Sequence, residues 1–129
     1  MKEFTSNIIV QPEHIDYLQH VNNIQYVSWV QDIAIAHWEA AVTASINKNY
    51  FWVLLEHHIE YKKPGFLNDV IEVKTYIKEN SGVTSKRVVE FYNKQNQTLL
   101  ASSTTTWCLF NQITKKPNRI TPEIMNCFK

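Results

Sequence analysis

The spacing of hydrophobic residues divides the chain into one long helical segment and several strand-like segments. Between residues 22 and 44, apolar residues recur at steps of three and four, at Ile24, Val27, Val30, Ala34, Trp38 and Ala41. This period predicts a single long α-helix. Apolar residues also occupy its other sides, so we expect the helix to be buried nearly all round. Asn22 or Asn23 suits the N-cap, because a side-chain oxygen there can accept an unpaired backbone N–H.

The remainder of the chain has the composition and the spacing of β-strands. Strands are expected at 4–11, 50–63, 69–79, 83–94 and 98–110. The third of these alternates most clearly, and the residues expected on its buried face are Ile71, Val73, Thr75 and Ile77. Turns at 80–82 and near Asn96 join the last three strands, which predicts antiparallel neighbours. A short helix is expected after Pro122.

The expected lengths of the helix and the strands match. A helix over 22–44 would span about 34 Å, and a strand of 11 residues would span about 37 Å. A curved antiparallel sheet of about five strands can therefore wrap the helix along most of its length. We expect residues 1–129 to form one α+β domain.

Composition and charge narrow the classes of function. The chain has thirteen basic and twelve acidic residues. This balance gives no excess of positive charge of the kind that binds nucleic acid or an anionic membrane. No apolar run approaches the roughly 20 residues that a membrane-spanning helix needs, and the first residues do not resemble a signal peptide. The two cysteines, Cys108 and Cys127, form no metal or redox spacing. The sequence thus predicts a cytoplasmic protein without a metal or a cofactor.

The segment just before the predicted helix carries the candidate chemistry. It holds the carboxylate of Asp16, the imidazole of His20 and the carboxamides of Asn22 and Asn23. A helix N-terminus exposes unpaired N–H groups and a partial positive charge, which can polarise a carbonyl group. A nearby carboxylate can attack that carbonyl or deprotonate a water molecule. Asn23 can orient the water or bind the carbonyl, whereas capping of a turn is the alternative role for Asp16.

The pattern D-x-x-x-H-V-N-N-x-x-Y-x-x-W, from Asp16 to Trp29, resembles the signature of 4-hydroxybenzoyl-CoA thioesterase-like proteins of the hotdog superfamily. It is also similar to that of acyl-acyl-carrier-protein (acyl-ACP) thioesterases. The stretches Tyr61–Pro64 and Thr106–Asn111 resemble later parts of the same family. The resemblance implies a hotdog fold and hydrolysis of an acyl-CoA or acyl-ACP thioester. It further implies a homodimer or homotetramer with each site at a subunit interface.

The resemblance also suggests roles for particular residues. Asp16 would act as nucleophile or general base, and the backbone N–H groups from Asn22 to Ile24 would polarise the thioester carbonyl. His20 would either order the loop or take part in proton transfer. Tyr26 is a further candidate for substrate contact, with packing as the simpler interpretation. Candidates for the phosphates of CoA are Lys63 and Arg87, and candidates for lining an acyl channel are Trp29, Phe51 and Trp52.

Three positions depart from the family pattern. Relatives typically carry Gly where this chain has Gln19, a second acidic residue where it has His14, and a turn Gly where it has Asn68. Glycine permits a positive φ and close approach of a ligand. A second hypothesis is therefore a non-catalytic module that binds acyl thioesters. A third, a dehydratase of the same fold, would need a His-Phe-Pro-Gly stretch or a paired Asp/His motif, and neither is present in the sequence.

Overall fold

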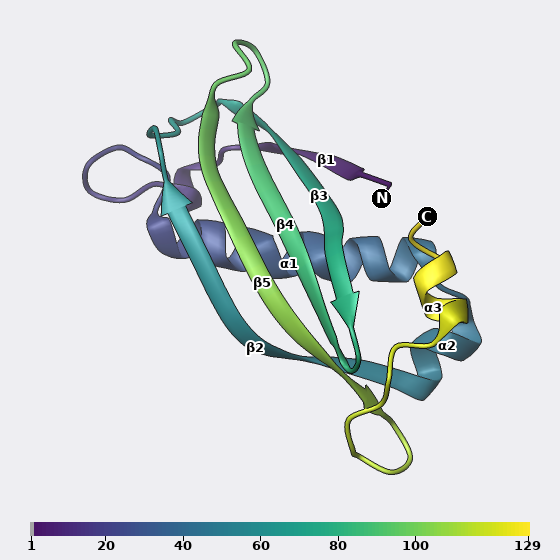
Figure 1. Ribbon diagram of the computed structural model, residues 1–129. Coiled ribbons are helices and arrows are strands. Elements are labelled where there is room, and N and C mark those ends of the chain that lie inside the picture. Colours follow the sequence, from purple (N-terminus) through teal and green to yellow (C-terminus); the bar gives the residue numbers. More distant parts are fainter. Residues whose placement is uncertain (1) are drawn as a thin grey trace.

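A long helix, α1 (Asn23–Ala41), crosses one face of a five-stranded antiparallel sheet (Figure 1). The structure, a computed structural model, describes residues 2–129. The other elements are β1 (Phe4–Ile9), η1 (Pro12–His14), α2 (Ala44–Asn49), β2 (Tyr50–Tyr61), β3 (Val70–Ser81), β4 (Thr84–Asn93), β5 (Leu99–Asn111) and α3 (Pro122–Asn126). The strands lie in the order β1-β3-β4-β5-β2. The expected α+β fold is confirmed.

The sheet is irregular in three of its four strand pairs, and each irregularity bends it. Register shifts occur between Leu54 and Glu56 in β2, Ile77 and Glu79 in β3, and Phe91 and Tyr92 in β4. An extra residue in one strand of a pair bends that strand and increases its twist. The sheet therefore curves toward α1 instead of lying flat against it.

The alternation expected in β3 is confirmed. Its four inward residues are nearly inaccessible to solvent, and they are Ile71, Val73, Thr75 and Ile77. Packed between β1 and β4, this strand lies well inside the sheet. The apolar face of β3 is thereby fixed against the helix. A shift of the strand register by one residue would move every buried side chain of β3 to the opposite face of the sheet.

The helix itself differs from expectation in two ways. It ends at Ala41, because Val42 and Thr43 are extended and the Thr43 side chain caps a separate helix, α2, by accepting the N–H of Ile46. It also buries one face only, since Ile24 and Ile35 are 75% and 52% exposed. The prediction of burial on nearly all sides was wrong because a sheet on one side covers one face of a helix.

Two clusters of buried residues divide the core along α1. The first lies around its N-terminal half, with Tyr26, Trp29 and Phe91 among its members. The second lies around its C-terminal half, with Trp38 and Phe128 among its members. Aromatic side chains form much of both clusters, and their rings meet mainly edge to face, which is a favoured geometry for aromatic pairs.

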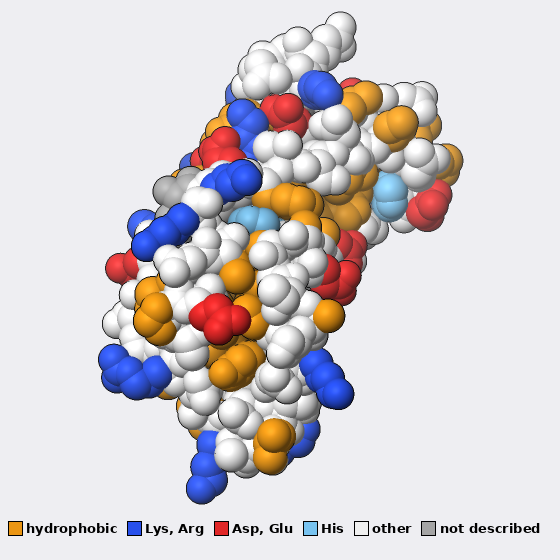
Figure 2. Space-filling model, turned by 90° about the vertical axis from the view of Figure 1, so that its right-hand side faces the viewer, with side chains coloured by type: hydrophobic (Ala, Val, Ile, Leu, Met, Phe, Trp, Pro, Cys, Tyr) orange, Lys and Arg blue, Asp and Glu red, His pale blue; other side chains and the backbone are white. Residues whose placement is uncertain are grey.

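The two ends of the chain meet over the C-terminal half of α1. The N–H of Lys2 donates to the carbonyl oxygen of Phe128 at 3.3 Å. Phe4 stacks on the His37 ring at 5.0 Å between centroids, and Phe128 meets the same ring edge-on at 4.9 Å. Figure 2 looks at this end of the molecule, where hydrophobic side chains lie in small groups among charged ones. None of the helices between residues 2 and 129 has the length and apolarity needed to cross a bilayer.

Candidate active site at the start of the long helix

The loop that carries Asp16 is a small closed turn. Ile15 and Val21 form an antiparallel bridge, and the Asp16 N–H donates to the carbonyl oxygen of His20 at 2.9 Å. The Oδ1 atom of Asp16 accepts the N–H groups of Leu18 at 2.9 Å and His20 at 3.3 Å. Asp16 therefore does cap a turn. Its other carboxylate oxygen, Oδ2, has no hydrogen-bond partner within residues 2–129 and is available to a substrate.

Gln19 completes this turn in a left-handed conformation, with φ of +65°. In this conformation the Cβ atom of a residue comes too close to the backbone carbonyl oxygen, a clash that glycine avoids. This is the position at which the family pattern that the sequence resembles has Gly. The loop thus keeps a glycine-like backbone despite the glutamine side chain. Asn68, in a different loop, also has a left-handed backbone, with φ of +70°.

The hydrogen bonds at the start of α1 leave one backbone amide free. The N–H of Asn22 donates to the carbonyl oxygen of His14, and that of Gln25 donates to the carbonyl oxygen of Asn22, both at 2.9 Å. The Ile24 N–H donates to Oδ1 of Asn22 at 2.9 Å, so Asn22 is the N-cap. For the N–H of Asn23 there is no partner in the described chain. Of the three amides expected to polarise a carbonyl, only that of Asn23 remains available.

A cavity of about 290 Å³ opens beside this free amide. It brings together most of the residues singled out from the sequence, because Asp16, His20, Asn23, Tyr26 and Lys63 all line it. Neither Asn22 nor Ile24 belongs to its lining, and both are engaged in the N-cap. The cavity therefore holds a carboxylate, an imidazole and a free helix-terminal amide, which is the set needed to polarise and cleave a carbonyl compound.

Tyr26 has an unexpected feature in this cavity. Its side chain is 3% exposed, and its hydroxyl oxygen is enclosed with no hydrogen-bond partner among residues 2–129. Burial, reinforced by the nearby Asp69 and Tyr61, raises the pKa of Tyr26 to about 12. The hydroxyl therefore stays protonated at neutral pH and can donate. Gly65 makes room for it, since a Cβ atom on Gly65 would lie 3.1 Å from the hydroxyl oxygen.

Tyr61 also lines the cavity, and the sequence did not single it out as a site residue. Its hydroxyl donates to the carbonyl oxygen of Asn23 at 3.2 Å and so ties the end of β2 to the start of α1. The signal that could have revealed it is its place in the Tyr-Lys-Lys-Pro stretch. Within that stretch Lys62 forms an ion pair with Glu60, whereas Lys63 is exposed and forms no ion pair in the described part of the chain.

Arg87 does not lie at this site. It is 5% exposed, and it lines a different cavity beside the C-terminal half of α1. Phe51 and Trp52, expected to line an acyl channel, border that cavity as well, while Trp29 lies in the core. Arg87 and Lys63, the two candidates for the phosphates of CoA, therefore line different cavities of the chain.

Comparison with known families and curated proteins places the chain among thioesterases. The model of the acyl-ACP thioesterase N-terminal domain matches residues 1–128. The chain is 27% identical over 97 residues to the chloroplastic oleoyl-acyl carrier protein thioesterase 2 of Arabidopsis thaliana, an alignment that covers 74% of this chain and 26% of that protein. It is 24% identical over 82 residues to the long-chain acyl-CoA thioesterase FadM of Escherichia coli, covering 60% of each. The alignments thus span less than two thirds of either relative.

Solved structures support the fold. The probable thioesterase YbaW of Escherichia coli superimposes with a TM-score of 0.85 over 95% of this chain and 94% of that one, at 19% sequence identity. At this level of identity the similarity concerns the fold alone, and it agrees with the hotdog arrangement expected from the sequence.

Proposed function

The chain belongs to the family of acyl-ACP thioesterase N-terminal domains, and from this premise we propose that it hydrolyses an acyl thioester to a carboxylic acid and a free thiol. One observation carries the proposal. The free carboxylate oxygen of Asp16 and the free N–H of Asn23 belong to residues that line the same cavity. A thioester carbonyl placed there would meet a hydrogen-bond donor and a carboxylate together.

In this proposal the thioester carbonyl oxygen accepts the N–H of Asn23 at the positive end of α1. Negative charge that develops on this oxygen is stabilised by the free amide and by the helix dipole. The Tyr26 hydroxyl is protonated and without a partner, but it is enclosed in the wall of the cavity, so it supplies a second donor only when a shift of that wall admits the carbonyl oxygen.

Asp16 then acts in one of two ways. As a nucleophile, its carboxylate attacks the carbonyl carbon, the C–S bond breaks and the thiolate leaves. Water hydrolyses the resulting anhydride and restores the carboxylate. As a general base, Asp16 takes a proton from a water molecule that attacks the carbonyl directly. In both routes the thiolate needs one proton, and His20 is the imidazole in the cavity that can deliver it.

The thiol carrier is CoA or acyl carrier protein in this proposal. Lys63 lines the cavity, is exposed and has no ion-pair partner in the described chain, so its ammonium group is free to bind a phosphate. A phosphate group is common to CoA and to the prosthetic arm of a carrier protein. The substrate panel below therefore includes both carriers.

The proposed assembly is a homodimer with the site near the interface. β2 is an edge strand, paired with β5 alone, so one row of its backbone N–H and C=O groups is open. Leu55 projects from it and is 55% exposed. Tyr61, at the end of the same strand, lines the cavity. A second copy paired with β2 would thus stand next to Asp16.

The test is steady-state hydrolysis of a panel of acyl-CoA and acyl-ACP thioesters by the unaltered chain and by Asp16→Asn. The variant keeps an oxygen that can accept from Leu18 and His20, so the turn is preserved. We expect turnover to fall at least about tenfold with an unchanged circular dichroism spectrum. Equal rates would remove Asp16 from the mechanism. Tight binding of acyl-CoA without any turnover in the unaltered chain would instead favour the non-catalytic module.

Assembly is tested separately by light scattering. We expect the mass of two chains for the unaltered protein and of one chain for Leu55→Lys, because a buried lysine without a partner disfavours an interface. Ile113→Lys is the matched control, since Ile113 is exposed and lies outside β2. If Leu55→Lys leaves the mass at two chains, the dimer does not form through this edge.

A further inference from the structure

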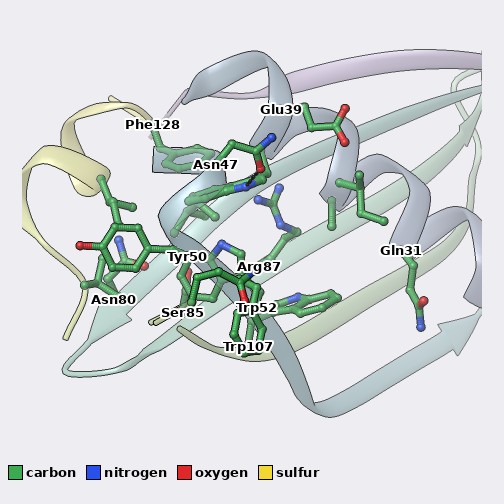
Figure 3. A pocket seen from close by; sticks show the side chains of 18 residues that line it. Gln31, Glu39, Asn47, Tyr50, Trp52, Asn80, Ser85, Arg87, Trp107 and Phe128 are labelled. Atoms are coloured by element: carbon green, nitrogen blue, oxygen red, sulfur yellow. Dashed lines mark hydrogen bonds between the residues drawn. The ribbon is translucent and has the colours of Figure 1, made fainter. Parts of the chain in front are cut away.

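A second cavity, of about 390 Å³, lies beside the C-terminal half of α1 and is separate in its lining from the one that holds Asp16. Its walls are mainly aromatic and aliphatic, with Trp38, Trp52, Trp107, Ile77 and Phe128 among them. Figure 3 shows Arg87 among these side chains. A pocket of this size with mainly apolar walls and several polar groups is suited to a small organic molecule.

Arg87 is buried in this cavity without a negative partner. Its Nη1 atom lies 2.8 Å from Nδ1 of His37 and donates to Oγ1 of Thr75 at 2.9 Å. No carboxylate comes within 4.0 Å of its guanidinium in the described part of the chain. Burial lowers the pKa of Arg87 to about 10, so the group still carries its charge at neutral pH.

Neither hydrogen-bond partner of Arg87 supplies the missing charge. The pKa of His37 is lowered to about 4, chiefly by burial and next by Arg87 and Lys2, so its ring is neutral at neutral pH. Thr75 donates its hydroxyl to the carbonyl oxygen of Val88 and only accepts from Arg87. A buried cation with neutral partners alone carries a large desolvation cost. An anion in the cavity would offset this cost.

The free N–H groups of Arg87 have the geometry for one kind of anion. Both of its hydrogen bonds come from Nη1, and Nε and Nη2 have no partner within residues 2–129. The only fully enclosed polar side-chain atom without a partner in that range is the Tyr26 hydroxyl oxygen, so Nε and Nη2 must border open space. These two atoms form the side-on edge of the guanidinium, which binds the two oxygens of a carboxylate together.

Ser85 adds a second donor on the same wall. It stands two residues before Arg87 in β4, so both side chains project from one face of the strand. It is 5% exposed, lines the cavity, and its hydroxyl forms no hydrogen bond to the described chain. A carboxylate held by Arg87 would lie within the polar corner that these two residues form, and the rest of its molecule would contact the aromatic walls.

We propose that this cavity is a binding site for a small monocarboxylate with an apolar body, whose carboxylate is held by the side-on edge of Arg87. A carboxylate is favoured over a phosphate because Arg87 is the only cationic side chain in the lining, and Glu39 also borders it. The inference does not depend on the proposed hydrolysis, because it rests on binding at a cavity with different walls.

The experiment is calorimetric titration of the full chain with decanoate, 1-decanol and decyl phosphate. We expect decanoate to bind about tenfold more tightly than 1-decanol, since a hydrogen bond to a charged group is worth more than one to a neutral group. In Arg87→Met the affinity for decanoate should fall about tenfold while that for 1-decanol is kept. Lys86→Met is the matched control, because Lys86 is the neighbouring exposed cation on the other face of β4.

Three results would overturn the proposal. The first is equal or weaker binding of decanoate relative to 1-decanol by the unaltered chain, and the second is an unchanged affinity for decanoate in Arg87→Met. Tighter binding of decyl phosphate than of decanoate would show that the site prefers a phosphate to a carboxylate, and this result would also reject the proposal. If Arg87→Met fails to fold, Arg87→Lys decides, because it keeps the charge but loses the two-pronged edge and should weaken decanoate binding alone.

Discussion

The side-chain oxygen of Asn22 accepts the backbone N–H of Ile24 at 2.9 Å, and this bond determines which amide of the helix start is free. With Ile24 engaged in the cap, and Asn22 and Gln25 bonded elsewhere, the N–H of Asn23 alone has no partner within residues 2–129. The cap therefore has two consequences, one for the stability of α1 and one for the placement of the donor.

Replacing Asn22 tests the first of these consequences, the stability of α1. Asn22→Ala removes the N-cap and should lower the free energy of unfolding by about 1 kcal/mol. Asn22→Asp keeps an accepting oxygen and adds a favourable charge at the helix start, so it should unfold like the unaltered chain or later. Urea denaturation followed by circular dichroism measures both variants. Equal stability of the Ala and Asp variants would show that the capping bond contributes nothing.

Tyr26→Phe should raise stability and lower activity. The enclosed hydroxyl has no partner in the described chain, so removing it should recover about 1 kcal/mol of desolvation cost. If the hydroxyl donates to the thioester carbonyl, turnover should also fall about tenfold or more. Thermal denaturation and steady-state kinetics measure the two effects on one sample.

Tyr61→Phe is the control for this substitution. It removes a hydroxyl from the same cavity, but one that already donates to the carbonyl oxygen of Asn23. Loss of this bond should lower stability instead of raising it. A Tyr26→Phe variant that is less stable than the unaltered chain would mean that its hydroxyl has a partner after all.

Gln19→Gly should stabilise the Asp16 turn. Gln19 has a φ of +65°, and the left-handed conformation costs a residue with a Cβ atom about 1 kcal/mol or more. Relief of that cost outweighs the added freedom of the unfolded chain, so the melting temperature should rise. Gln95→Gly is the matched control at an exposed position that is not left-handed, where glycine should destabilise. A fall in melting temperature for both variants would contradict the argument.

Stability should depend on pH through His37. Its pKa falls from 6.5 in the unfolded chain to about 4 in the folded chain, first because of burial and then because of Arg87 and Lys2. Between pH 6.5 and 4 the unfolded chain therefore binds a proton that the folded chain does not. The free energy of unfolding should decrease as the pH falls through this window.

His37→Gln tests this dependence, because glutamine can accept from Arg87 but does not titrate. Urea denaturation at pH 7, 6 and 5 should give a flatter profile for this variant than for the unaltered chain. Some slope should remain, since burial also lowers the pKa of His57. Gln95→Ala, at an exposed position that carries no titratable group, serves as the control and should keep the full slope. Parallel profiles for all three proteins would exclude His37 as the source.

The fold could be predicted because its elements have clear periods. The strand alternation in β3 and the three- and four-residue steps of α1 are local properties, and the order of elements follows from them. The end of α1 was missed because Val42 and Thr43 are neither glycine nor proline. The break is revealed by the extended backbone of Val42 and Thr43 and by the hydrogen bond from Ile46 to the Thr43 side chain. The exposed side of α1 was missed because periodicity does not state how many neighbours a helix has.

The candidate site was predicted in part. Asp16, His20 and Asn23 are close in sequence, so their meeting at one cavity follows from a single loop. The choice of Asn23 as the free amide depends on bonds to His14 and within the cap, which no pattern encodes. The burial of Arg87 was not foreseen, although the alternation of β4 indicates it. Ser85, Arg87, Val89 and Phe91 all fall on its buried face.

The contact between Lys2 and Phe128 has a practical consequence for labelling. Both chain ends lie at the far end of α1 from Asp16 (Figure 1), and the helix between them measures about 28 Å. A fluorophore placed next to Lys2 or Phe128 would thus sit beside the Arg87 cavity and well away from Asp16 and the proposed thioester chemistry. One labelled protein could report ligand binding at the Arg87 cavity while hydrolysis at the candidate site is assayed separately.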